Sequence, residues 1–174
     1  MSYFTRNVDF GIMIDSEYKR ERGKTMKKEK SCGAVVWLKE DGRRLFLIEH
    51  MTGGHYSIPK GHVEGDETEV ETAEREIREE TALDVTIDTG FRRVITYSPA
   101  PEIEKDVVFF TAEAAGRKVS NQECEVSELF WLPYREALAR LTFDSDKDVL
   151  HGAEMYLRAK EFRRHMVDRT KKLR

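Results

Sequence analysis

The chain has 174 residues, of which 39% are hydrophobic and 36% are charged, and its formal net charge at pH 7 is −3. This length suits one domain with a core large enough to fold alone, and no apolar run approaches the roughly 20 residues that a membrane-spanning helix needs. The opening residues lack the basic start and long apolar stretch of a secretory signal. With only Cys32 and Cys124 as cysteines, the sequence predicts a cytoplasmic protein with reduced thiols and no membrane association.

The predicted elements alternate between strands and helices. Residues 1–30 show little periodicity and are predicted to form a poorly ordered extension, which leaves residues 31–174 as a single domain that includes the C-terminal helix. Apolar runs predict strands at Ser31–Leu38, Arg44–Glu49, Asp84–Ile87, Arg92–Tyr97, Lys105–Glu113 and Leu129–Leu132. A turn is expected at Glu40-Asp41-Gly42, and a loop from Met51 to Pro59.

Helices are predicted over Thr68–Thr81, from Pro133-Tyr134 through Arg140, and from a cap at Asp144 or Ser145 to about Arg169. Strands before, between and after helices indicate an α/β (α+β) fold, with a mixed sheet and helices on its faces.

The first predicted helix is unusually acidic. Gly61–Leu83 contains nine acidic residues and two basic ones. On a helix, Glu76, Glu79 and Glu80 fall within an arc of roughly 100°, beside an apolar arc that would pack on the sheet. Carboxylates this close repel one another unless a cation lies between them, and hard oxygen ligands suit Mg²⁺ or Mn²⁺. A solvated acidic helix face is the simpler alternative.

The spacing of this segment resembles the Nudix box. Gly61 is followed after five residues by Glu67, and after seven more by Arg75-Glu76-Ile77-Arg78-Glu79-Glu80-Thr81-Ala82-Leu83. Only Ala82 departs from the pattern, which has glycine there. A glycine just past a helix commonly takes a left-handed conformation, so alanine should either cost about 1 kcal/mol or shift the helix end.

The resemblance implies a Nudix-type α/β/α sandwich and an enzyme that hydrolyses diphosphate linkages with Mg²⁺, for which Mn²⁺ is a possible substitute. Glu76, Glu79 and Glu80 would ligate the metal together with the Gly61 carbonyl, with Glu79 and Glu80 in the catalytic centre. Arg75 would orient the cluster by pairing with Glu67. Family members often add a carboxylate from a later loop as ligand or general base, and Glu125 is the first candidate, followed by Glu123 and Glu128.

Features outside the box look like the asymmetrical diadenosine tetraphosphate hydrolases. They include the segment from His55 to His62, the stretch from Phe91 to Tyr97, and residues 137–147. Lys60 and Lys105 could neutralise a polyphosphate and His62 could hydrogen-bond it, while Tyr97 and Phe143 could sandwich an adenine. For the two aromatic residues, a place in the core is an equally good expectation.

The expected partner is thus a small nucleoside polyphosphate, with diadenosine tetraphosphate cut to ATP and AMP. Two rivals keep the enzyme class but change the substrate, to the 5′ end of RNA or to a diphosphoinositol polyphosphate. A third rival is a non-catalytic Nudix module that senses a nucleotide. Apart from RNA 5′ ends, the sequence gives no indication of a nucleic-acid partner.

Overall fold

A computed structural model describes residues 26–120 and 125–172 of the chain. In chain order its elements are β1 (Lys27–Glu40), β2 (Arg43–Met51), β3 (Tyr56–Ser57), β4 (Lys60–His62), α2 (Glu69–Thr81), β5 (Val85–Tyr97), β6 (Ile103–Ala114), β7 (Val126–Pro133), α3 (Tyr134–Arg140) and α4 (Asp144–Lys172). No helix in the described ranges is long and apolar enough to cross a membrane.

Strand β1 lies at the centre of a mixed sheet. It pairs in parallel with β6 from Lys27 to Trp37, and antiparallel with β2 and β4 on its other edge. Strand β5 extends the sheet beyond β6, while β3 and β7 pair with β2. The tight β1–β2 connection is the predicted turn: Asp41 and Gly42 both have positive φ, 48° and 76°, as a two-residue hairpin turn requires.

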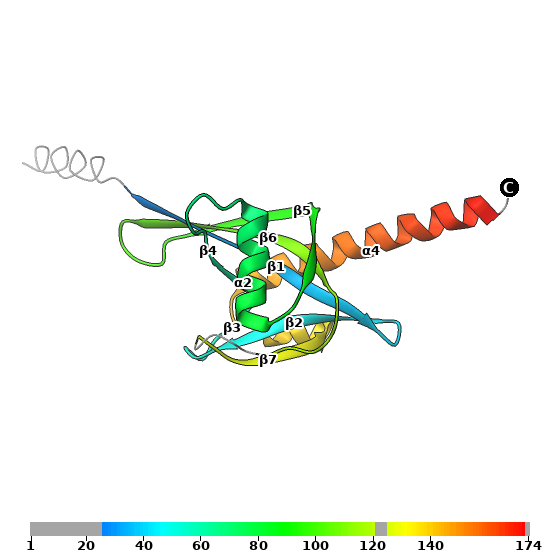
Figure 1. Cartoon of the computed structure of the whole chain (residues 1–174), viewed down its shortest axis with the longest axis horizontal. Coiled ribbons are helices and arrows are strands. Elements are labelled where there is room, and N and C mark those ends of the chain that lie inside the picture. Colours follow the sequence, from blue (N-terminus) through cyan, green and yellow to red (C-terminus); the bar gives the residue numbers. More distant parts are fainter. Residues whose placement is uncertain (1–25, 121–124, 173–174) are drawn as a thin grey trace, which may run out of the picture.

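Helices cover both faces of this sheet, which confirms the predicted layered fold. On one face, Ala73 and Ile77 of α2 pack against Val36 and Val108 of the sheet. On the other face, residues of α3 and α4, including Leu150, pack against sheet residues such as Phe109. Figure 1 shows α2 crossing one side of the sheet and α4 running away from the domain at its far end.

Three boundaries differ from the sequence-based expectation. The extension was expected to reach residue 30, but Lys27–Lys30 already belong to β1 because their backbone pairs with β6 at Ile103–Asp106; residues 1–25 lie outside the described ranges. The two strands expected between residues 84 and 97 form one element, β5, with an irregularity between Asp88 and Arg93. The loop predicted from Met51 to Pro59 contains the short strand β3, which pairs with β2.

Candidate active site

Helix α2 is fixed at its start by hydrogen bonds from its own sequence. The Thr68 side chain accepts from the Glu71 N–H at 3.3 Å, and the Glu71 carboxylate accepts from the Thr68 N–H at 2.8 Å. This reciprocal capping box satisfies two backbone donors that the helix leaves unpaired. Together with burial of Ala73 and Ile77, it holds the acidic edge of the helix at a defined place beside the sheet.

The helix ends where the family pattern expects, although Ala82 replaces glycine. Ala82 has φ 60° and ψ 20°, a left-handed conformation, and its N–H donates to the Arg78 carbonyl at 2.9 Å. Of the two consequences expected for alanine, the structure shows the unfavourable conformation rather than a displaced helix end. Replacing glycine with Ala82 therefore affects the stability of the helix end and does not displace the acidic residues of α2.

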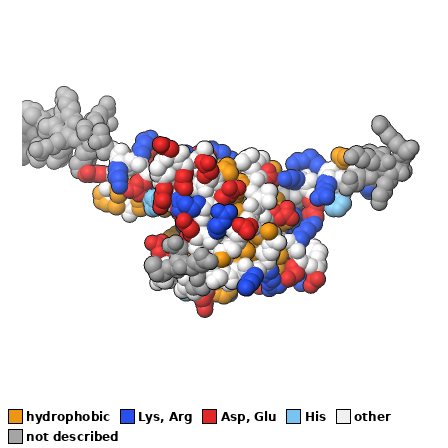
Figure 2. All heavy atoms as spheres, in the orientation of Figure 1, with side chains coloured by type: hydrophobic (Ala, Val, Ile, Leu, Met, Phe, Trp, Pro, Cys, Tyr) orange, Lys and Arg blue, Asp and Glu red, His pale blue; other side chains and the backbone are white. Residues whose placement is uncertain are grey.

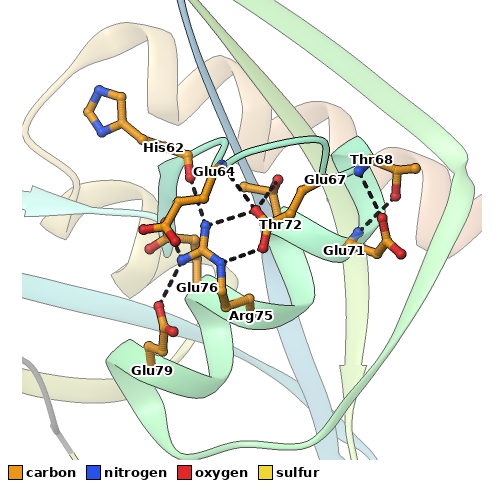
Figure 3. A network of polar contacts seen from close by, with 9 residues as sticks. All are labelled: His62, Glu64, Glu67, Thr68, Glu71, Thr72, Arg75, Glu76 and Glu79. Carbon is orange, nitrogen blue, oxygen red and sulfur yellow. Dashed lines mark hydrogen bonds and ion pairs between the residues drawn. The ribbon is translucent and has the colours of Figure 1, made fainter.

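Arg75 joins the acids of this segment into one network (Figure 3). Its Nε and Nη2 donate to the two oxygens of Glu67 at 2.7 and 3.0 Å, which is the predicted pair. Its Nη1 donates to Glu76 and Glu79 at 2.9 and 2.8 Å, and its Nη2 also donates to the His62 carbonyl. The Arg75 guanidinium holds the pKa of Glu67 at about 2. Arg75 thus fixes the positions of two predicted metal ligands.

Gly61 lies in β4, directly against the Glu76 carboxylate. A Cβ atom built on Gly61 would collide with that carboxylate. Glycine is therefore required here because any side chain would push Glu76 away from the strand. The close approach also places a predicted carboxylate ligand, Glu76, beside the backbone of Gly61.

Glu80 points into the protein and meets an acid that the sequence analysis did not select, Glu49 of β2. Glu80 is 5% exposed and Glu49 is 0% exposed, and the backbone N–H of Lys60 donates to Glu80 Oε2 at 3.1 Å. Burial raises the pKa of Glu80, and the neighbouring charge of Glu49 raises it further. Burial also raises the pKa of Glu49, against the attraction of the Lys60 ammonium group.

A signal for Glu49 was present in the sequence. Glu49 follows directly after the apolar run Leu45–Ile48 of β2, which lies between β3 and β7 at this point. An ionisable residue that ends a buried strand is costly, and such positions are often functional. The strand was predicted, but its neighbours in the sheet were not, so the burial of Glu49 was not foreseen.

The oxygen-rich donor set fits a hard divalent cation. Glu49 is fully buried, and its carboxylate oxygens accept from no N–H or hydroxyl donor. Its neighbour is the second acid, Glu80, with which it would have to share a proton, and a cation relieves that need. In the described ranges, no three acidic, histidine or cysteine side chains are already gathered around one point. The hydrogen bonds from Arg75 to Glu76 and Glu79 direct those two carboxylates toward the guanidinium.

Three of the predicted substrate-binding residues line one cavity of about 410 Å³: Lys60, Tyr97 and Phe143. Tyr97 ends β5 and Phe143 precedes α4, and their side chains are 44% and 50% exposed. The open alternative, that these aromatic residues belong to the core, is therefore wrong. His55 also lines the cavity, with its ring centroid 5.5 Å from that of Phe143.

The other two predicted binding residues meet beside the cavity. Lys105 Nζ lies 3.2 Å from His62 Nε2, and Lys105 pairs with Tyr97 across β5 and β6. Burial lowers the pKa of Lys105, and the nearby charge of Lys60 lowers it further. Lys60 thus lines the cavity, and Lys105, which contacts His62, is close enough to interact with the charge of Lys60.

Two of the three predicted later-loop carboxylates, Glu125 and Glu128, lie in the described ranges. Glu125 is exposed in the turn before β7, where its carbonyl accepts from the Thr52 N–H at 2.8 Å. Glu128 is exposed near His50, and Glu123 is outside the described ranges. The described contacts thus give Glu80 a different acidic neighbour, Glu49, while the role predicted for Glu125 remains a prediction.

Figure 2 shows acidic side chains, mixed with a few basic ones, on the face that α2 forms.

Fold and site together define a protein that presents carboxylates on a strand–loop–helix segment beside a basic, aromatic cavity. The profile of the NUDIX domain matches residues 29–151, and the chain therefore belongs to the Nudix family, whose members act as hydrolases on pyrophosphate bonds. Enzymes of this family generally use divalent metals such as Mg²⁺.

The chain is similar to several characterised relatives. It is 31% identical over 140 residues to the asymmetrical bis(5′-nucleosyl)-tetraphosphatase of Mus musculus, covering 74% of this chain and 95% of the relative. It is 33% identical to an 8-oxo-(d)GTP phosphatase of Mycolicibacterium smegmatis, over 70% of this chain and 40% of the relative. The crystal structure of a C. elegans Ap4A hydrolase binary complex shares the fold, with a TM-score of 0.69, 24% identity, and coverage of 75% of this chain and 98% of that one.

Proposed function

We propose that this enzyme hydrolyses a diphosphate linkage in a nucleoside polyphosphate with the help of a divalent metal, and that its substrate is diadenosine tetraphosphate, cut to ATP and AMP. The similarity to the mouse tetraphosphatase supports this choice. The cavity supports it independently, because two exposed aromatic side chains and a lysine suit a base followed by phosphates.

The observation that carries the proposal is the position of Lys60. Its side chain lines the aromatic cavity, while its backbone N–H holds the carboxylate of Glu80 at 3.1 Å. Lys60 therefore contacts both the cavity proposed to bind the nucleotide and the acidic cluster. A nucleotide bound between Tyr97 and Phe143 would extend its phosphates toward the acids of α2.

The residues divide the work between holding the metal and holding the substrate. Glu76, Glu79 and Glu80, with the Gly61 carbonyl, would hold Mg²⁺, which neutralises phosphate charge and lowers the pKa of bound water. A glutamate of this cluster would accept the proton of the attacking water. Lys60, His62 and Lys105 would offset the charge of the polyphosphate, while the two aromatic rings stack on the adenine.

A substrate panel with Mg²⁺ tests the proposal directly. Dinucleoside polyphosphates, nucleoside triphosphates including 8-oxo-dGTP, nucleoside diphosphate sugars, diphosphoinositol polyphosphates and triphosphorylated RNA would each be incubated with the enzyme, and the products separated. Diadenosine tetraphosphate should have the highest kcat/KM and give equal amounts of ATP and AMP. Two molecules of ADP as product, or a strong preference for RNA ends or diphosphoinositol polyphosphates, would contradict the proposal.

The matched variants Glu80→Gln and Glu74→Gln separate chemistry from folding. Both lie on α2 and both lose one charge, but only Glu80 belongs to the buried cluster. Glu80→Gln should abolish turnover and still bind nucleotide, whereas Glu74→Gln should remain active. Nucleotide binding without metal and without turnover in the unmodified chain would instead favour a sensing module.

A second experiment locates the phosphorus atom that water attacks. Hydrolysis in oxygen-18 water should label AMP, because water attacks the phosphorus that leaves in AMP. Label found only in ATP would mean that water attacks the phosphorus on the ATP side of the broken bond.

A further inference from the structure

Glu49 is the most deeply buried acid in the described part of the site, and its place in the sheet explains this burial. It pairs with Ser57 of β3 on one side and with Leu129 of β7 on the other. Its side chain is 0% exposed, and neither carboxylate oxygen accepts from an N–H or hydroxyl donor; the carboxyl group of Glu80 is its hydrogen-bonding neighbour, through a proton that the two acids would share. A buried carboxylate without partners costs several kcal/mol unless a proton or a cation compensates it.

The surroundings of Glu49 increase this cost. The acid that faces it is Glu80, itself buried, and a second acid of the cluster, Glu76, adds further repulsion. The ammonium group of Lys60 is the one attractive charge among its main electrostatic neighbours, and it also attracts Glu80 and Asp146. One lysine shared among three buried acids does not compensate them all, so ionisation of both Glu49 and Glu80 is unfavourable without a cation.

We infer that Glu49 belongs to the divalent-cation site and lies behind Glu80. Its negative charge strengthens the binding of the cation, and its side chain fixes the position of the Glu80 carboxylate. The cation site then draws on strand β2 as well as on helix α2. Glu49 acts through Glu80 and is a positioning residue. The inference rests on the metal dependence in the proposed function, and adds a residue that lies outside the Gly61–Leu83 segment.

Two consequences distinguish this role from ordinary packing. Replacing Glu49 with glutamine removes the repulsion and supplies an amide donor for Glu80, so the metal-free protein should become more stable. The same change should weaken metal binding, because neighbours of ligating carboxylates typically contribute about 10–100-fold to metal affinity. A buried side chain that only packs would show no loss of metal affinity when replaced by an isosteric one.

The experiment compares the unmodified full chain, Glu49→Gln and the control Glu113→Gln. Glu113 is an exposed glutamate on β6 opposite Trp37, so it controls for loss of one strand charge. Calorimetric titration with MgCl₂ and with MnCl₂ gives the Kd, and thermal unfolding in EDTA gives the Tm of the metal-free protein. Glu49→Gln should bind both ions at least about 10-fold more weakly and raise the metal-free Tm by about 2–4 °C or more; Glu113→Gln should change neither.

Each other outcome overturns the inference. If Glu49→Gln binds Mg²⁺ as tightly as the unmodified chain does, Glu49 is not part of the cation site, while the proposed function stands. If Glu49→Gln is less stable than the unmodified chain in EDTA, its carboxylate serves packing. If the unmodified chain binds neither ion, this inference and the metal dependence in the proposed function both fail.

Discussion

The backbone N–H of Lys60 and the Oε2 atom of Glu80 lie 3.1 Å apart and form a hydrogen bond between strand β4 and helix α2. These residues are 20 positions apart in the sequence, and the bond fixes the start of the Gly61–Leu83 segment to its end. Because the Lys60 side chain lines the nucleotide-sized cavity, the bond also sets the distance between that cavity and the acids. Small displacements of β4 should therefore affect catalysis more than stability.

Gly61→Ala should lower kcat/KM by about 100-fold, because its Cβ would collide with the Glu76 carboxylate and displacements of about 1 Å at a reacting centre carry losses of this size. Steady-state kinetics with diadenosine tetraphosphate measure the effect. Gly116→Ala is the matched control, since no atom lies within 4 Å of the Cβ built there. Equal activity of the two variants would show that the contact between Gly61 and Glu76 is not needed.

Tyr97→Ala and Phe143→Ala should each raise KM by about 5–150-fold with little change in kcat, because stacking on a base contributes about 1–3 kcal/mol per aromatic side chain. Both side chains line the cavity and remain about half exposed, so their loss should leave the Tm nearly unchanged. Phe162→Ala provides the control, as Phe162 is 66% exposed on α4, away from the cavity. A fall in kcat at constant KM would contradict a base-stacking role.

Ala82→Gly should increase the free energy of unfolding by about 1 kcal/mol, because alanine at φ 60° carries a steric cost that glycine avoids. Urea denaturation measures the difference. Ala82→Val should have the opposite sign, since a β-branched residue is strongly disfavoured at positive φ. If glycine fails to stabilise the protein, the conformation assigned to Ala82 is not the one present in solution.

Stability at acidic pH should depend on Glu69 at the start of α2. Its bidentate hydrogen bond from Arg92, helped by Lys30, lowers the pKa of Glu69 from 4.5 to about 2. A carboxyl group with a lowered folded-state pKa stabilises the fold above its unfolded pKa, and this contribution is lost as the pH falls from about 4.5 toward 2.

Glu69→Gln should accordingly lower the free energy of unfolding at pH 7 and flatten its dependence on pH between about 4.5 and 2. Urea titrations at pH 7, 4.5 and 3 test this. Glu71→Gln is a useful comparison because Glu71 lies in the same helical turn, where its lowered pKa comes from the Thr68 capping bonds. If the free energy of unfolding of Glu69→Gln depends on pH as that of the unmodified chain does, the Glu69–Arg92 pair is not the source of the pH dependence.

The sequence by itself determined the family, the acidic helix and most of the elements. Spacing along α2 is local, so the placement of Glu76, Glu79 and Glu80 on one side follows from helix geometry. The Arg75–Glu67 pair was implied by the resemblance to the Nudix box, and the structure contains it. The Asp41-Gly42 turn is equally local. Sequence reasoning also selected Lys60, Tyr97 and Phe143, which the fold brings to one cavity.

Only the tertiary structure decided which distant groups meet. The parallel pairing of β1 with β6 brings Lys27–Lys30 into the sheet, and no local pattern encodes the partner of a strand. The pairing of β2 with β3 and β7 buries Glu49 beside Glu80. Repulsion, desolvation and cation binding depend on such distances in space, so the sequence determined which acids lie on α2, and the fold decided that a strand acid joins them.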